Sequence, residues 1–336
     1  MTASASAGWR NTAFTELIGT RLPIVQAPMA GGWTPPRLVA EVCEAGGLGS
    51  LAGAMLAPEV LRDQIRDIRS RTGMPFAVNL FAPLPAPTRR GLAEWAVLTG
   101  MPVPEPADPA VRFSDQLAVV SAERVPVLSF TFGIPPVDDF AGITIGTATT
   151  VAEAVALVDS GVDAVVAQGY EAGGHRGTFL TGLDSGELSQ SLVGTIALVP
   201  QIVDAVDIPV IASGGIMDGR GIAAARALGA QGVQLGTAFL ATDEAGIDPD
   251  FRLALNEPTT VTATLTGRPA RAVRSAAVRR LEASGVRPPD YPLGRQFLSG
   301  PPRLVGQGGG MARSIPAAEL IDLLERETTT ALDALR

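Results

Sequence analysis

The sequence predicts a closed α/β barrel of eight parallel strands, a TIM (β/α)8 barrel, with a small inserted capping domain after strand eight. Short apolar runs alternate with helical patterns through most of the 336 residues. These runs are apolar throughout rather than at every second position, which is typical of a parallel sheet covered by helices. Polar and glycine-rich motifs follow many of the strands, whereas an open doubly wound sheet, the alternative fold, would gather them at one switch point.

The barrel elements follow one another in a regular order. The strand candidates are residues 23–27, 47–51, 76–80, 125–130, 143–147, 164–167, 209–212 and 232–235. Helix candidates between them are residues 35–45, 58–71, 151–160, 189–206 and 219–228. Several helices end in a glycine that comes directly before the next strand, at Gly46, Gly161 and Gly229, as expected for glycine C-caps.

Two segments interrupt this order. Residues 83–109 are rich in proline and are predicted to pass over the barrel face. Residues 242–311 are long and rich in Arg, Pro and Gly, with a strand-like pattern at 259–266 and a helical pattern at 270–282. An amphipathic segment, 316–335, then resembles a final barrel helix. We therefore expect a barrel formed by residues 1–241 and 312–336, and a smaller capping domain formed by residues 242–311.

Composition excludes several classes of protein. The net charge is −8 and there is no dense basic cluster, so a nucleic-acid partner is not expected. Residues 1–8 lack the charged start and apolar block of a signal peptide. No uncharged apolar run approaches the ~18 residues that a membrane helix needs. We expect a soluble, cytoplasmic protein with no membrane partner.

The absence of lysine and the scarcity of cysteine and histidine exclude several kinds of catalytic and binding site. The chain has no lysine, which excludes a Schiff base and the phosphate-binding lysine of the P-loop. With one cysteine and one histidine it can form neither an internal disulfide nor a His/Cys zinc site. A carboxylate metal site stays open as an alternative, and we expect no bound metal. Cys43 lies in a helical apolar pattern, which indicates a buried core thiol.

The single histidine, His175, lies in a glycine-rich loop that follows the strand candidate 164–167. Such a loop lets the backbone approach a ligand closely, and an imidazole exchanges protons near neutral pH. This end of a barrel strand is where barrel enzymes hold their catalytic groups. His175 is therefore the candidate proton-transfer group. The neighbouring Arg176 is interpreted either as an attractor for an anion or as a solvated side chain.

Other candidate ligand residues follow other strands. Asn79 and Gln168 offer both a hydrogen-bond donor and an acceptor, which suits the edge of a heterocycle. Glycines with neighbouring hydroxyl donors follow strands seven and eight, where barrels commonly bind phosphate through backbone N–H groups. The residues at these two positions are Ser213, Gly214 and Gly215, and Gly236 and Thr237. The sequence thus predicts a phosphorylated, heterocyclic ligand.

These motifs together resemble the nitronate monooxygenases, formerly called 2-nitropropane dioxygenases, which are FMN-dependent barrel enzymes. The resemblance covers about residues 22–240 and resumes weakly near Tyr291 and Gly306. The glycine–histidine loop is its most specific part. The motifs that carry it are Gln26-Ala27-Pro28-Met29, Gly46-Gly47-Leu48-Gly49, Gln168-Gly169-x-Glu171-Ala172-Gly173-Gly174-His175, Ala212-Ser213-Gly214-Gly215-Ile216 and Gly236-Thr237.

The resemblance implies a role for each site residue. His175 would be the catalytic base, and Gln307 would reach back to the cofactor from the inserted segment. The other expected FMN contacts are Ala27, Pro28 and Met29 near the isoalloxazine, Asn79 and Gln168 at its polar edge, Gly173 and Gly174 along the ring and ribityl chain, and Gly214, Gly215, Gly236 and Thr237 at the phosphate. One departure is the short connection 134–142 between strands four and five, where the family usually has a helix.

The resemblance implies oxidation of alkyl nitronates by O2 to a carbonyl compound and nitrite, with neutral nitroalkanes first deprotonated by His175. The alternative is an NAD(P)H-dependent flavin reductase acting on quinones or enoyl thioesters, because related barrels share the same FMN motifs. A third interpretation is a non-catalytic flavin- or phosphate-binding partner protein. The sequence leaves open the physiological substrate and whether two chains pair as a homodimer.

Overall fold

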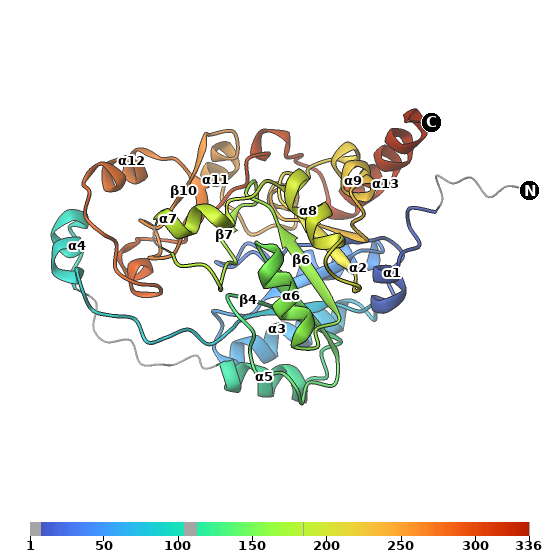
Figure 1. Cartoon of the computed structure of the whole chain (residues 1–336), viewed down its shortest axis with the longest axis horizontal. Helices are drawn as coiled ribbons and strands as arrows, with labels where there is room; N and C mark the ends of the chain where they lie inside the picture. The colour runs from blue at the N-terminus through green and yellow to red at the C-terminus, as the bar shows by residue number, and fades with distance from the viewer. Residues whose placement is uncertain (1–7, 104–112, 184, 336) are drawn as a thin grey trace, which may run out of the picture.

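Eight parallel strands close into a barrel in the computed structural model, which describes residues 8–103, 113–183 and 185–335 (Figure 1). The first and last strands of the ring pair with each other, with Val25 opposite Gln234, so the barrel fold is confirmed and the open sheet is excluded. The barrel strands, in order around the ring, are β1 (Ile24–Gln26), β2 (Leu48–Ala52), β3 (Ala77–Phe81), β4 (Val127–Thr131), β5 (Ile143–Ala148), β6 (Ala164–Gln168), β8 (Val210–Ser213) and β9 (Gly232–Leu235).

Helices surround the barrel and join its strands. The α-helices are α1 (Ala13–Ile18), α2 (Pro36–Glu44), α3 (Pro58–Arg71), α4 (Leu92–Thr99), α5 (Phe113–Ala122), α6 (Val151–Asp159), α7 (Ser185–Leu188), α8 (Thr195–Val203), α9 (Gly219–Ala227), α10 (Thr237–Leu240), α11 (Pro249–Ala254), α12 (Ala276–Ala283) and α13 (Ala317–Ala334). Short 3-10 helices are η2 (Ser189–Ser191), η3 (Leu293–Phe297) and η4 (Gly309–Met311). The final helix α13 packs between α2 and α9, which closes the outer ring.

The helix ends confirm the sequence signals. Gly46, Gly161 and Gly229 have φ of 95°, 85° and 94°, a left-handed conformation that glycine adopts without steric cost. Cys43 is buried in α2, as predicted. Burial raises the pKa of the Cys43 thiol to about 12, so it stays protonated and unreactive at neutral pH.

The amino-terminal end of the barrel is closed by α1. Thr12 caps this helix and accepts a hydrogen bond from the Thr15 backbone, while Thr15 reciprocates. Phe14 is fully buried and packs with inward-facing residues of the strands, including Val25 and Ile211. Because this end is filled by apolar side chains, the carboxyl ends of the strands are left for the site.

A second, three-stranded antiparallel sheet lies beside the barrel. Its strands, in spatial order, are β10 (Thr259–Thr262), β11 (Ala270–Val273) and β7 (Gly174–His175). The pairing places Ala270 opposite His175 and Arg271 opposite Gly174. The inserted segment 242–311 is therefore joined by backbone pairing to the histidine loop that follows β6.

The proline-rich excursion packs against this inserted segment. Helix α4 lies beside α12 in Figure 1, and Trp95 of α4 is buried in a cluster with Leu281 of α12, Leu293 and Phe297. The last part of the predicted excursion, residues 104–109, lies outside the described residues, as does most of the N-terminal stretch 1–8.

Two predicted helices need correction. The prediction of one helix over 189–206 is wrong, because η2 ends at Ser191 and α8 begins only at Thr195. The carboxylate of Glu171 accepts the Thr195 N–H, so the start of α8 is set by a residue 24 positions earlier. The helix predicted over 270–282 is also wrong in its first part, because Ala270–Val273 is strand β11 and α12 begins at Ala276.

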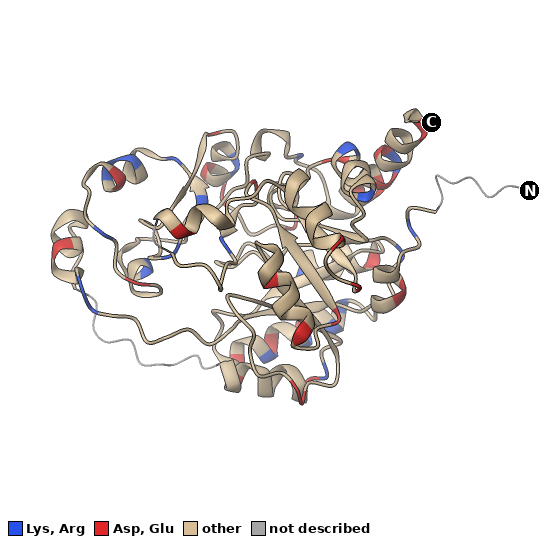
Figure 2. Ribbon diagram, viewed as in Figure 1, with Lys and Arg blue, Asp and Glu red and all other residues tan. Residues whose placement is uncertain are grey.

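Acidic and basic residues alternate along the ribbons of the outer helices, for example α12 and α13 (Figure 2). Within the described ranges, no helix combines the length and apolar character needed to span a bilayer. The connection between β4 and β5, residues 132–142, contains no helix, as the sequence indicated.

Candidate active site

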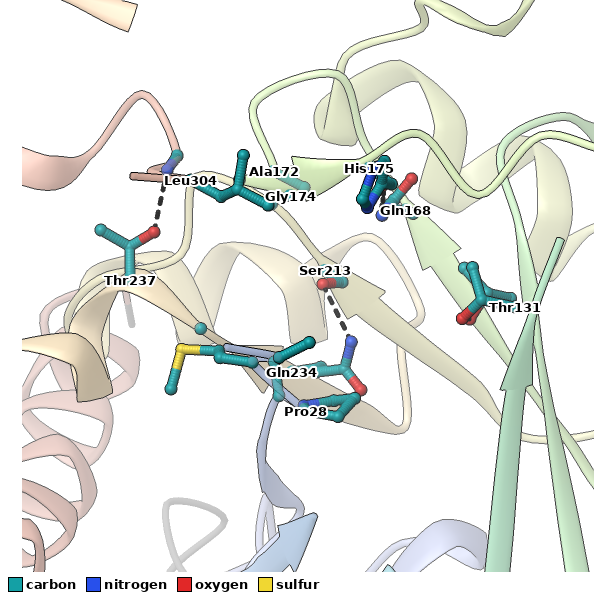
Figure 3. A pocket seen from close by; sticks show the side chains of 18 of the residues that line it. Pro28, Thr131, Gln168, Ala172, Gly174, His175, Ser213, Gln234, Thr237 and Leu304 are labelled. Atoms are coloured by element: carbon teal, nitrogen blue, oxygen red, sulfur yellow. Dashed lines mark hydrogen bonds between the residues drawn. The ribbon is translucent and has the colours of Figure 1, made fainter. Parts of the chain in front are cut away.

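One cavity opens at the carboxyl ends of the barrel strands, with about 1360 Å³ of empty space including its open mouth. Residues from the loops after β1, β3, β6, β8 and β9 line it, together with residues of the inserted segment (Figure 3). Of the residues singled out from the sequence, those that line it are Ala27, Pro28, Met29, Asn79, Gln168, Gly173, Gly174, His175, Ser213, Gly214, Gly215, Gly236 and Thr237.

His175 is held at both its backbone and its ring. Its carbonyl accepts a hydrogen bond from Gln168 Nε2 at 3.0 Å, and its ring Nε2 lies 2.9 Å from the hydroxyl of Thr266. Three aromatic rings face the imidazole edge-on, with centroid distances of 5.4 Å to Tyr291, 5.7 Å to Phe132 and 6.4 Å to Phe81. The imidazole therefore has a fixed position in the wall of the cavity.

The electrostatic environment keeps His175 neutral. Burial, and then the positive charges of Arg268 and Arg295, lower the pKa of His175 to about 3. At neutral pH the ring carries one proton and one free lone pair, so it can accept a proton. Arg295 lines the same cavity, so the site combines a neutral base with a nearby positive charge.

Arg176 has neither of the two roles considered from the sequence. It is buried and donates to the backbone carbonyls of Gly169 at 2.7 Å, Ser191 at 2.7 Å and Gln168 at 3.0 Å. Both interpretations, an anion attractor and a solvated side chain, are therefore wrong. The guanidinium is a structural clamp inside the histidine loop, where it satisfies carbonyl groups that a turn leaves unpaired.

Two more buried charged residues hold the same loop. Arg271 of β11 donates to the Tyr170 carbonyl at 2.8 and 3.1 Å, and its guanidinium lies 4.3 Å from the centroid of the Tyr170 ring. Glu153 of α6 accepts from the Phe179 N–H at 2.6 Å and from the Thr178 hydroxyl at 2.6 Å. Residues 168–180 are thus fixed from both sides, which preorganises the loop that carries His175.

The polar groups in the cavity wall suit the binding of a flat heterocycle. Asn79 Nδ2 donates to Ser129 at 3.0 Å, while its Oδ1 has no protein partner among the described residues. Gln168 is bonded to the His175 carbonyl and, through Oε1, to the Gly177 N–H at 2.9 Å. A Cβ added to Gly174 would meet no atom within 4 Å, so the backbone there faces open space. These features fit the edge and face of a flavin ring.

The glycine loops after β8 and β9 fit a phosphate. In the part of the chain that the structure describes, the backbone N–H groups of Gly215, Gly236 and Thr237 find no protein acceptor. Ser213 faces Gln234, whose Nε2 lies 3.4 Å from the Ser213 hydroxyl (Figure 3). Unpaired N–H groups beside a hydroxyl are what an anionic oxygen binds. The N-terminus of α8 is not available, because Glu171 occupies it.

Gln307 is not among the residues that line the cavity, unlike the other site residues predicted from the sequence. Its side chain is exposed, and its backbone N–H donates to the Glu171 carbonyl at 3.0 Å. Its neighbours Gly306 and Gly308 line the cavity, and Gly306 N–H donates to the Thr237 hydroxyl at 2.9 Å (Figure 3). A contact between the Gln307 side chain and a cofactor stays a prediction.

Sequence reasoning missed several residues of the cavity wall. Gln234 could have been found, because it is a polar residue near the end of the apolar run 232–235. The aromatic residue Phe81 directly follows the strand candidate 76–80, and Phe132 lies two residues after the strand candidate 125–130, so both carried a similar signal. Thr266 and Arg295 carried none, because they lie 91 and 120 positions beyond His175 and reach it only through the fold.

A closed parallel β/α barrel, with a cavity at the carboxyl ends of its strands, is the architecture of the barrel enzymes. The chain matches the family model described as nitronate monooxygenase over residues 11–312. It belongs to the nitronate monooxygenase family, which is a family of flavin-dependent oxidoreductases, so the resemblance seen in the sequence is confirmed.

Relatives support the assignment over nearly the whole chain. The nitronate monooxygenase of Pseudomonas aeruginosa is 40% identical over 350 residues, covering 94% of this chain and 98% of the relative. The nitroalkane oxidase of Streptomyces ansochromogenes superimposes with a TM-score of 0.85 and 40% identity, covering 97% and 100% of the two chains. FabK from Thermotoga maritima superimposes with a TM-score of 0.76 and 30% identity, covering 97% of this chain and 98% of that one.

Proposed function

We propose that this chain binds FMN and oxidises alkyl nitronates with O2 to a carbonyl compound and nitrite, and that His175 is the base for neutral nitroalkanes. The observation that carries the proposal is that His175, whose pKa is lowered by burial and by nearby positive charge, lines the same cavity as the Arg295 guanidinium, and that this cavity fits a flavin. The family and the nitroalkane oxidase neighbour support the substrate class.

The proposed cofactor site uses the residues identified above. Asn79 and Gln168 would bond the polar edge of the flavin, and Gly173 and Gly174 would lie along it. Bound FMN would supply the one-electron oxidation of the nitronate. The phosphate would bind at the loops after β8 and β9, through the residues Ser213, Gly214, Gly215, Gly236 and Thr237.

The chain's own residues carry the remaining steps. The positive charge of Arg295 attracts the anionic nitronate, or the developing negative charge on a nitroalkane that loses its α-proton. His175 accepts that proton, and the electron pair of the C–H bond becomes the C=N bond of the nitronate. The imidazolium then lies beside the nitronate anion, and their attraction offsets the low proton affinity of the free site.

We infer that segment 242–311 acts as a cap on this site. Residues Thr266, Arg295, Leu304 and Gly306 of the segment line the cavity. Pairing between β11 and β7 attaches the segment to the histidine loop. Such a cap would exclude water from the reacting anion, which strengthens the electrostatic interactions within the site.

The proposal is tested with purified His175→Asn and two substrates. We expect the variant to retain FMN, identified by mass spectrometry of the released cofactor, and to lose activity on a nitroalkane by roughly 100-fold or more. Oxidation of the preformed nitronate of the same compound should be much less affected, because it needs no proton removal. Equal losses on both substrates would exclude the base role.

A second experiment separates the monooxygenase from the reductase alternative. The flavin of the wild-type protein is mixed without oxygen with a nitronate, and separately with NADH. Bleaching by the nitronate supports the proposed function. Bleaching by NADH alone would favour the reductase, and a protein that binds no FMN would favour a non-catalytic role.

A further inference from the structure

We propose that Thr266 is a positioning residue that fixes the tautomer of His175, so that Nδ1 is the atom that accepts the substrate proton. The inference rests on the proposed function, because it assigns the proton-accepting atom of the proposed base. It deepens that function by adding a residue of the inserted segment to the machinery for proton removal.

The hydrogen bonds of the Thr266 hydroxyl determine which nitrogen of the His175 ring carries the proton. A threonine hydroxyl has one proton to donate and can accept two hydrogen bonds. Thr266 Oγ1 donates to the Arg268 carbonyl at 3.1 Å, which uses its only proton. It accepts from the Arg268 N–H at 3.4 Å, and its remaining lone pair faces His175 Nε2 at 2.9 Å. With the Thr266 proton on the Arg268 carbonyl, the ring proton of His175 is assigned to Nε2.

The neutral state of the His175 ring determines which nitrogen keeps a free lone pair. A neutral imidazole has one N–H and one lone pair, so a proton on Nε2 leaves the lone pair on Nδ1. Among the described residues Nδ1 has no hydrogen-bond partner, and it is not one of the buried unpartnered atoms. The free lone pair is therefore accessible in the ring that lines the cavity.

Thr266 itself is held rigidly by the loop around it. It is buried in the loop that joins β10 and β11, where the Gly267 N–H donates to the Ala263 carbonyl at 2.8 Å. A Cβ on Gly294 would lie 2.6 Å from the Gly267 nitrogen, so the two backbones are in close contact. The same hairpin pairs with His175 through Ala270. The β10–β11 hairpin thus fixes both the ring and the backbone of His175.

The charged and titratable groups around the ring do not compete for Nδ1. Arg268 donates to the Thr178 carbonyl and Arg295 to the Met55 sulfur, and Tyr291 packs edge-on against the ring, so among the described residues none of the three forms a hydrogen bond to Nδ1. As the substrate proton moves to Nδ1, the ring becomes an imidazolium with N–H groups at both nitrogens. The Nε2–H remains bonded to the Thr266 oxygen, which carries part of the positive charge through that hydrogen bond.

The test uses the fact that the chain has one histidine. Protein labelled with ¹⁵N-histidine gives one pair of ring nitrogen signals, and their shifts show which nitrogen carries the proton. We expect wild type and Thr266→Ser to show Nε2 protonated and Nδ1 unprotonated. Thr266→Val, which has the same shape but no hydroxyl, should show a mixture of tautomers.

Kinetics give the second measurement. For Thr266→Val we expect kcat/KM on a nitroalkane to fall roughly 10- to 100-fold, with a much smaller loss on the preformed nitronate and recovery in Thr266→Ser. A wild-type spectrum with Nδ1 protonated overturns the proposal, and this result does not require Thr266→Val to fold. An unchanged tautomer and unchanged kinetics in Thr266→Val also overturn it. The spectrum needs no substrate, so it is independent of whether nitronate oxidation itself is confirmed.

Discussion

The guanidinium carbon of Arg268 lies 4.1 Å from the centroid of the Phe132 ring. Phe132 has a φ of 80°, a left-handed conformation that is strained for a residue with a large side chain. Arg268 is buried and also donates to the Thr178 carbonyl, so it ties the inserted hairpin to the end of β4 and to the histidine loop. The strained residue thus belongs to the aromatic wall around His175.

We expect Arg268→Met to lower the free energy of unfolding by about 1–3 kcal/mol, because the buried Thr178 carbonyl loses its hydrogen-bond donor. The pKa of His175 should rise, since one of the two positive charges that lower it is removed. Urea denaturation and ¹⁵N titration of the single histidine measure the two effects. Arg303→Met is the matched control, because Arg303 lies over Phe251 at 6.0 Å but is exposed. Equal losses in both variants would contradict the role given to Arg268.

The barrel itself could be predicted from the sequence because its signals are local. Each strand run is apolar throughout, since helices cover its outer face and side chains fill its interior. Glycines such as Gly46 and Gly229 end helices where the chain reverses toward the next strand. The loops after the strands then meet at one end for geometric reasons alone, so most of the candidate site residues share one cavity.

The inserted segment could not be predicted in the same way, because long-range contacts determine it. Residues 270–273 have a pattern compatible with a helix and form a strand because they pair with β10 and with Gly174 and His175. Arg176 is polar in the sequence and buried in the fold, since the carbonyls that it binds come together only when the loop closes. No local pattern indicates that Thr266 lies against the histidine ring.

Gly173→Ala should weaken binding of the cofactor and reduce stability. A Cβ at this position would lie 2.5 Å from the Gly306 nitrogen and 2.7 Å from the Val305 carbonyl carbon, so the two segments would have to separate. That movement would break the bond from Gly306 N–H to the Thr237 hydroxyl. We expect the FMN dissociation constant to rise at least tenfold and the free energy of unfolding to fall by about 1–3 kcal/mol.

Fluorescence titration with FMN and urea denaturation measure the consequences of Gly173→Ala. The control is Gly300→Ala, where an added Cβ would meet no atom within 4 Å and the backbone needs no positive φ. If Gly173→Ala binds FMN as tightly as wild type does, the close contact between the histidine loop and residues 305–306 has no part in the cofactor site.

Replacing Arg295 by glutamine should raise KM for a nitronate about tenfold, because a charge-assisted interaction with the anion is lost. Arg295 forms no ion pair with a carboxylate among the described residues, so its charge is available to a ligand. The nitronate KM of wild type should also increase with salt, and that dependence should weaken in the variant. Arg274→Gln, outside the cavity, is the control for the loss of one positive charge. An unchanged KM in Arg295→Gln would mean that the nitronate does not approach this side chain.

The stability of the protein should depend on pH through His175. In the folded chain its pKa is about 3, whereas an unfolded histidine titrates near its ordinary value of about 6.5. Between these values the unfolded state binds one more proton, so the free energy of unfolding falls as the pH falls from about 6.5 toward 3. His175→Asn lacks this proton uptake. At pH 4.5 we expect the free energy of unfolding of wild type to have fallen by about 1–3 kcal/mol more than that of the variant, relative to pH 7.5.

Urea denaturation of both proteins at several pH values, with the same excess of FMN, measures this difference. The titration of the carboxylates is shared by both proteins and cancels in the comparison. Parallel stability curves over this range would show that His175 titrates normally in the folded protein, and the neutral base in the proposed mechanism would then need another cause.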